Sequence, residues 1–178
     1  MKAYDMARYI CAKKGKMNQL QLQKLIYYID AWNLAILKSP IIDEDFQAWL
    51  HGPVVNELWQ KLKSEGVESL YSPIFVGNIK QKKETIKEIK ALASKERLQV
   101  TDDTLKTYGN ETGYYLECLT REEFPWKAAW LGLDESIKFY DALLHWRTEA
   151  SPGRDGSSTR AISKDLMKTF YEKQLDRI

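Results

Sequence analysis

The sequence predicts a mainly α-helical protein, folded as one compact domain over residues 1–178 around a buried central helix. The stretch at residues 18–38 is apolar around most of a helical circumference, which is typical of a helix inside a core. Helical spacing of apolar residues recurs along most of the chain, and the 44% hydrophobic content is ordinary for a globular fold. A chain of 178 residues is also long enough to bury a core without disulfides or metals.

The central helix carries start and stop signals at its two ends. Asn18 suits the N-cap position, and Gln21 stands where a capping box places its reciprocal partner. Lys38 and the following Ser39-Pro40 end the helix. Its main apolar face is formed by Leu22, Leu25, Ile26, Ile29, Trp32 and Ile36, and a narrow polar stripe by Gln19, Gln23 and Asp30. Neighbouring segments must cover this helix, because an isolated helix of this length is marginal in water.

The segments that flank the central helix predict one more helix on each side and a small β element. Residues 1–14 form a first helix that ends in two lysines and a glycine. Residues 46–50 alternate apolar and polar side chains, which predicts a short extended segment that Gly52-Pro53 stops. Pro53 then suits the first position of a second core helix. Residues 74–76 are too ambiguous to assign but are able to add a strand at a sheet edge.

The second half of the chain is predicted to be helical except for one loop. Residues 80–97 form a helical run whose seven cations and three anions leave a local charge of +4. Further helical segments are predicted at residues 102–108, 112–119 and 120–148. Residues 150–160 are rich in glycine and serine and poor in apolar side chains, which predicts a mobile loop. Ser163 caps a final helix that docks through Leu166 and Phe170.

Composition and the cysteine count favour a soluble cytoplasmic protein. Lys and Arg number 27 against 25 Asp and Glu, so a net charge of +2 gives little nonspecific attraction to nucleic acid or anionic membrane. Cys11 and Cys118, in a chain without a hydrophobic N-terminal signal, predict reduced and buried thiols. No apolar run approaches the roughly 18 to 20 residues that span a bilayer. We therefore expect no membrane partner.

The sequence shows no catalytic motif, and no cofactor or metal is expected. His51 and His145 are the only histidines, and neither lies in a metal-ligand spacing. Asp43-Glu44-Asp45 lacks the spaced oxygen ligands and the glycine of a calcium loop, so it is interpreted as a solvated turn. Gly109 and Gly113 lack the lysine and the strand-to-helix setting of a phosphate-binding loop.

Three stretches, LQLQKLIYYIDAWNLAI, DEDFQAWLHGPVVNELW and LTREEFPWKAAW, carry family motifs in a specific order and spacing. Between residues 18 and 130 they resemble the Panacea domain, the SocA-like antitoxin family often found in phage-associated genes. The resemblance implies a helical domain that neutralises a cognate protein toxin by direct contact and has no enzyme activity. Two departures concern the partner: Arg121 stands where the family has a histidine, and the connection at residues 134–158 is longer than usual.

Two turns are candidates for partner binding. Gly52 and Pro53 fix the backbone at the end of the extended segment, so Trp49 and His51 would be held rigidly and lose little freedom on binding. In the alternative interpretation Trp49 is a core residue and Gly52-Pro53 only shapes the turn. The second candidate turn contains Arg121, Pro125 and Trp126.

Two alternatives to simple toxin binding remain open. Some members of the resembled family deliver a toxin to a cellular protease, and the polar loop at residues 150–160 is compatible with such an adaptor. The other alternative is a nucleic-acid-binding regulator. Its phosphate contacts would come from Lys80, Lys82, Lys83, Lys87 and Lys90. No recognition motif accompanies these charges, and charge runs on helices more often form a solvated face.

Overall fold

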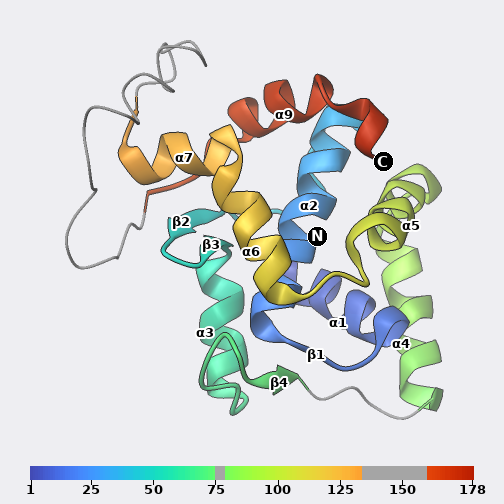
Figure 1. The fold of residues 1–178 in the computed structure, drawn as a ribbon. Helices are drawn as coiled ribbons and strands as arrows, with labels where there is room; N and C mark the ends of the chain where they lie inside the picture. Colours follow the sequence, from blue (N-terminus) through green and yellow to red (C-terminus); the bar gives the residue numbers. More distant parts are fainter. Residues whose placement is uncertain (75–78, 134–159) are drawn as a thin grey trace.

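Helix α2 (Gln19–Leu37) runs through the middle of the protein, in a computed structural model that describes residues 1–74, 79–133 and 160–178. Around it pack α5 (Lys95–Tyr108), α6 (Gly113–Glu122) and α9 (Lys164–Glu172), as Figure 1 shows. Every residue of α2 from Leu22 to Ala35 is buried. The predicted mainly helical fold around a buried central helix is therefore confirmed.

The two ends of α2 follow the local signals in the sequence, with one correction. The Asn18 side chain accepts the Gln21 amide at 2.8 Å and caps the helix, and Lys38 ends it in a left-handed conformation with φ 59°. The reciprocal half of the predicted capping box is wrong. The Gln21 side chain instead donates to the carbonyl of Glu111 at 2.8 Å, because the loop before α6 lies against this end of α2.

The basic run at residues 80–97 contains a helix break that the sequence analysis missed. Helix α4 (Ile79–Leu92) packs on α1 (Ala3–Lys14) and ends at Leu92. Helix α5 begins after Ser94. The Ser94 hydroxyl accepts the amide of Arg97 at 3.4 Å and so provides an N-cap. The separate helix predicted at residues 102–108 is the second half of α5.

The β structure consists of two short antiparallel pairs in the described part of the chain. Strand β2 (Gln47–Trp49) pairs with β3 (Gly52–Val54), and β1 (Met17–Asn18) pairs with β4 (Pro73–Ile74). The predicted extended segment is confirmed, but Pro53 pairs with Ala48 instead of starting a helix. Helix α3 (Asn56–Ser64) begins only after Val55. Residues 75 and 76 of the second predicted β element lie outside the described residues.

The segment from residue 120 onward is not one continuous helix. The segment predicted as helical from residue 120 is divided at Glu123, where α6 ends and α7 (Phe124–Leu131) begins with Pro125 in its first turn. Residues 134–148 and most of the predicted loop, residues 150–159, lie outside the described residues.

The last helix docks through the predicted Phe170 and through two residues that are more deeply buried. Ser163 caps α9 as expected, by accepting the amide of Leu166 at 3.3 Å. The side chains that this helix buries completely are Met167 and Tyr171, whereas Leu166 and Phe170 are only partly buried. The Tyr171 ring meets Trp32 of α2 edge-on at 5.1 Å, and a short 3-10 turn, η1 (Leu175–Arg177), follows.

The two cysteines differ in exposure. Cys11 is buried in α1, and this burial raises the pKa of its thiol to about 11. Cys118 is exposed on α6, so the prediction that both thiols are buried is wrong. The reason is that Cys118 lies on the face of α6 that points away from α2, next to Tyr114 one helical turn earlier. Both thiols are free.

Candidate functional site

The β2–β3 hairpin is held close to two helices by a glycine. Gly52 has a φ of +86°, which a residue with a Cβ atom adopts only with strain. A Cβ atom at this position would lie 2.8 Å from Lys24 Cε and 2.9 Å from Thr120 Oγ1. The hairpin therefore fits between α2 and α6 because position 52 has no side chain.

Two buried polar side chains of α2 fix the backbone that leaves the hairpin. The Lys24 ammonium donates to the carbonyl of Pro53 at 2.8 Å, and the Gln23 amide oxygen accepts the amide of Val55 at 2.9 Å. Complete burial lowers the pKa of Lys24 to about 7, although the nearby Glu117 carboxylate opposes this shift. The conformation of the hairpin thus depends on α2, to which the family motif in LQLQKL belongs.

A buried carboxylate connects the hairpin to α6. Glu117 Oε1 lies 3.0 Å from Nδ1 of His51 and 3.6 Å from Nη1 of Arg121. The Arg121 guanidinium also lies over the ring of Trp126, 5.5 Å from its centre. The side chains of His51 and Arg121 are 39% and 42% exposed, whereas that of Glu117 is only 7% exposed. Glu117 therefore holds two partly exposed nitrogen-containing side chains at the surface.

The tryptophans of the two candidate turns contact each other through the backbone. Trp126 is buried, and its ring nitrogen donates to the carbonyl of Trp49 at 3.1 Å. The Trp126 ring stacks on the ring of Trp130, with ring centres 5.2 Å apart. The partly buried Trp49 ring meets Trp59 edge-on at 5.5 Å. The two turns predicted separately from the sequence therefore form one structural unit.

The structure divides the predicted partner-binding residues into two groups. Gly52, Pro53, Pro125 and Trp126 are buried, and Trp49 is partly buried. The side chains of His51 and Arg121 are partly exposed. The buried members position the exposed pair, and contact of any of these residues with a partner stays a prediction.

Sequence reasoning missed a group of exposed aromatic and aliphatic side chains beside this pair. Leu50 at the hairpin tip is 43% exposed, Tyr71 is 59% exposed, and Tyr114 and Tyr115 on α6 are 73% and 51% exposed. Tyr71 meets His51 edge-on at a ring distance of 6.0 Å. We call the surface formed by Leu50, His51, Tyr71, Tyr114 and Arg121 the α6–hairpin face. It combines large apolar side chains with a histidine and an arginine.

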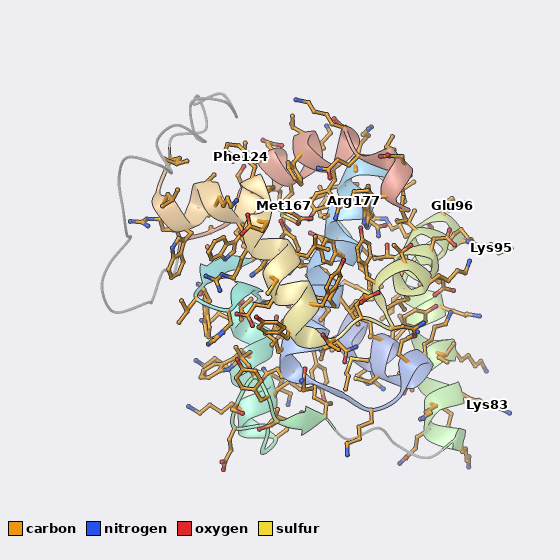
Figure 2. All side chains as sticks on the ribbon, in the orientation of Figure 1. Lys83, Lys95, Glu96, Phe124, Met167 and Arg177 are labelled. Carbon is orange, nitrogen blue, oxygen red and sulfur yellow. The ribbon has the colours of Figure 1, made fainter. Side chains whose placement is uncertain are left out.

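A second carboxylate, Glu123 between α6 and α7, lies in a closed polar cluster. It accepts hydrogen bonds from the hydroxyls of Tyr28, at 3.2 Å, and Tyr171, and from the guanidinium of Arg177 at 3.0 Å. Burial raises the pKa of Glu123, and these hydrogen bonds oppose the shift. Figure 2 labels Arg177 near α2, between α9 and α5. This cluster ties the C-terminal turn to the core.

The described residues give no support for a metal or membrane site. Within residues 1–74, 79–133 and 160–178, no three His, Cys, Asp or Glu side chains are close enough together to hold a metal ion. Asp43 and Glu44 of the acidic turn instead bind the N-terminal ammonium and the Ala3 amide, at 3.1 and 3.0 Å. In the same ranges, no helix has the length and apolar character needed to cross a bilayer.

Comparison with known proteins identifies one family. The family model described as antitoxin SocA-like, Panacea domain, matches residues 22–127, which is more than half of the chain. The matched range starts in α2, ends in α7 and includes the hairpin, Lys24, Glu117 and the whole α6–hairpin face. No curated protein and no solved structure matches the chain.

Proposed function

The chain belongs to the antitoxin SocA-like, Panacea domain family, and on this premise we propose that it is an antitoxin that neutralises a cognate protein toxin by direct binding. In this proposal the protein acts as a binding partner and catalyses no reaction. Its cytoplasmic location and its association with phage genes stay predictions.

The observation that carries the proposal is the α6–hairpin face. Tyrosine and arginine are enriched at the centres of protein interfaces, because they bury a large area with few rotatable bonds or form several hydrogen bonds. This face presents two exposed tyrosines, Tyr71 and Tyr114, and Arg121. Glu117 and Trp126 already restrict the Arg121 side chain, so binding would cost it less conformational entropy.

Co-expression with the product of a neighbouring gene tests the proposal. We expect that product to be toxic alone, to be neutralised by this protein, and to elute with it as one complex on gel filtration. Replacing Tyr114 and Arg121 together by alanine should weaken the complex by about 30-fold or more, as expected for loss of a hot spot worth about 2 kcal/mol.

The control is Leu92→Ala, because Leu92 is also an exposed large apolar residue, at 60%, but lies on α4 outside the face. It should leave both affinity and neutralisation unchanged. A neighbouring toxin that stays equally toxic and forms no complex would rule out the antitoxin proposal. If the control and the double variant weaken toxin binding equally, the α6–hairpin face is not the binding surface.

A second candidate function, nucleic-acid binding, is favoured by one observation on α4. Its exposed face carries lysines at spacings of three and four residues, at Lys80, Lys83, Lys87 and Lys90. Figure 2 shows Lys83 at the outer edge of the protein. If these lysines bind duplex phosphates, the affinity should fall with salt at a slope near 0.9 per phosphate contacted. Absence of saturable binding at physiological salt would exclude this function.

The adaptor alternative rests on the loop at residues 150–160, of which only Arg160 is described. Delivery of the toxin to a protease stays a prediction that a half-life measurement distinguishes from inhibition by binding alone. In protease-proficient cells, an adaptor shortens the lifetime of the toxin, whereas a purely occluding antitoxin does not.

A further inference from the structure

We propose that a surface pocket beside α6 receives a basic side chain, lysine or arginine, from the partner protein, an inference that rests on the proposed function. The pocket has a volume of about 430 Å³ and lies between α5, α6 and the C-terminal segment. Its walls and rim include Tyr108, Glu111, Tyr115, Glu122, Glu123 and Phe170.

The walls suit a cation with an apolar stem. The rings of Tyr108, Tyr115 and Phe170 line the pocket from α5, α6 and α9. Lysine and arginine side chains pack their methylene groups along such surfaces, and their charged ends are attracted to aromatic faces. A pocket with these aromatic walls would therefore contact both the methylene groups and the charged end of a basic side chain.

The charges around the pocket select for a cation. The carboxylate of Glu123 and the guanidinium of Arg177 pair with each other at 3.0 Å, so this part of the lining is close to neutral. Glu111 and Glu122 add two further carboxylates to the lining, which contains no other cation. Glu111 has no ion-pair partner among the described residues, and Glu122 pairs with Lys127, which does not line the pocket. An anion would be repelled here.

The position of the pocket indicates that its occupant belongs to a protein. Tyr115 of the pocket lining directly follows Tyr114 of the α6–hairpin face in α6, so the two surfaces border each other along this helix. A partner docked on that face would bring its own side chains to the rim of the pocket. A single free amine would gain only the contacts inside the pocket, whereas a side chain of the docked partner shares the binding energy of both surfaces.

Titration of the isolated protein with model side chains tests the pocket without the toxin. The probes are N-acetyl-lysine methylamide and the uncharged analogue N-acetyl-norleucine methylamide, followed by amide shifts in NMR spectra of ¹⁵N-labelled protein. We expect the lysine probe to shift resonances of Tyr115 and Leu119, and the norleucine probe to leave them unchanged. Glu111→Gln with Glu122→Gln should weaken binding of the lysine probe by about fivefold, because two exposed ion pairs are lost.

Glu68→Gln is the control, because Glu68 is an exposed carboxylate on the loop before β4 and does not line the pocket. It should bind the lysine probe like the wild type. The inference is overturned if the lysine probe causes no shifts in the pocket, if norleucine binds equally well, or if the double variant binds as tightly as the wild type.

Measurement with the toxin separates this inference from the proposed function. A double variant that keeps full affinity for a toxin neutralised by the wild type overturns the pocket and leaves the antitoxin function standing. A protein that binds the lysine probe in the pocket but neutralises no neighbouring toxin fails the proposed function alone.

Discussion

The two halves of α2 both bury polar side chains, but they place them in networks of opposite kinds. In the N-terminal half, Lys24 holds the hairpin, and its neighbour Glu117 leads outward to His51 and Arg121, which are partly exposed. In the C-terminal half, Tyr28 reaches Glu123, whose other partners are the buried Tyr171 and the half-buried Arg177 of the C-terminal segment. We call the Glu123 network closed, because its partners tie the C-terminal segment to the core, and the Lys24–Glu117 network open, because it ends in His51 and Arg121 at the surface. The comparison indicates that the buried charge of the closed network stabilises the fold, whereas that of the open network positions surface side chains.

The closed network should give the largest effect on stability. Glu123→Ala removes the shared acceptor of Tyr28, Tyr171 and Arg177 and leaves a half-buried guanidinium without its carboxylate. A hydrogen bond to a charged group contributes about 1.5 to 3 kcal/mol, so loss of this carboxylate with its three donors should cost about 3 kcal/mol or more. Urea unfolding measures this loss. Glu122→Ala, at the exposed neighbouring position, should change the free energy of unfolding by less than about 0.5 kcal/mol. Similar effects at the two positions would refute the distinction.

Asp30, also in the C-terminal half of α2, should make the stability of the protein depend on pH. Its Oδ1 accepts the amides of Ile41 and Ile42 at 2.7 and 2.8 Å, while its buried Oδ2 has no hydrogen-bond partner among the described residues. Burial raises the pKa of Asp30 from 3.8 to about 6, although these amides, Lys164 and the N-terminal ammonium oppose the shift. The native state then binds the proton more tightly than the unfolded state.

The stability from this proton is therefore fully present below pH 3.8 and is lost as the pH rises through about 6. Its size is about 3 kcal/mol, from a shift of about two pKa units. Asp30→Asn keeps the acceptor for both amides and cannot titrate, so its stability should depend less on pH between about 4 and 6. Unfolding curves of both proteins across this range measure the difference. Equal slopes would show that Asp30 does not titrate as inferred.

Substitution of Gly52 tests whether the β2–β3 hairpin is as tightly constrained as its contacts with Lys24 and Thr120 indicate. Gly52→Ala adds backbone strain and a Cβ atom within 3 Å of Lys24 and Thr120, for a total cost of about 2 to 3 kcal/mol. Gly66→Ala is a matched control, because Gly66 has a similar φ of +90° but no atom within 4 Å of the added Cβ. It should cost about 1 kcal/mol. Equal losses would mean that the hairpin yields to the extra atom.

His51 should give the smallest change in stability and a clear change in function. Because it is partly exposed, His51→Ala should cost less than about 1 kcal/mol and leave the melting temperature within a few degrees. It should nevertheless weaken toxin neutralisation. Trp49→Ala should impair both, because the partly buried ring packs on Trp59. If His51→Ala unfolds the protein or leaves neutralisation intact, the hairpin is structural and the open network does not mark the binding surface.

The sequence predicted those parts of the fold that depend on neighbours along the chain. The N-caps Asn18 and Ser163 and the apolar face of α2 as far as Trp32 are local features that the structure confirms. Ile36, predicted on the same face, is 38% exposed, so this part of the prediction is wrong. The break at Ser94 was missed, because charged residues continue with helical spacing on both sides of it.

The partners of the buried polar residues could not be predicted in this way. Lys24 and Asp30 are bonded to backbone groups of Pro53, Ile41 and Ile42, and helical periodicity contains no information about such distant partners. The binding surface shows the same limit. Tyr27-Tyr28 and Tyr114-Tyr115 are identical pairs in helices, but the first pair is buried and the second is exposed. Only the packing around each helix distinguishes them.

Cys118 places a reactive thiol on the exposed side of α6. Its thiol is accessible, whereas Cys11 is buried and its raised pKa keeps it protonated. A maleimide fluorophore should therefore label the native protein at a single position, one helical turn from Tyr114 and three residues before Arg121. The emission of such a dye reports directly when another molecule covers this part of α6, and protection of the unlabelled thiol from alkylation provides a footprint of the same event.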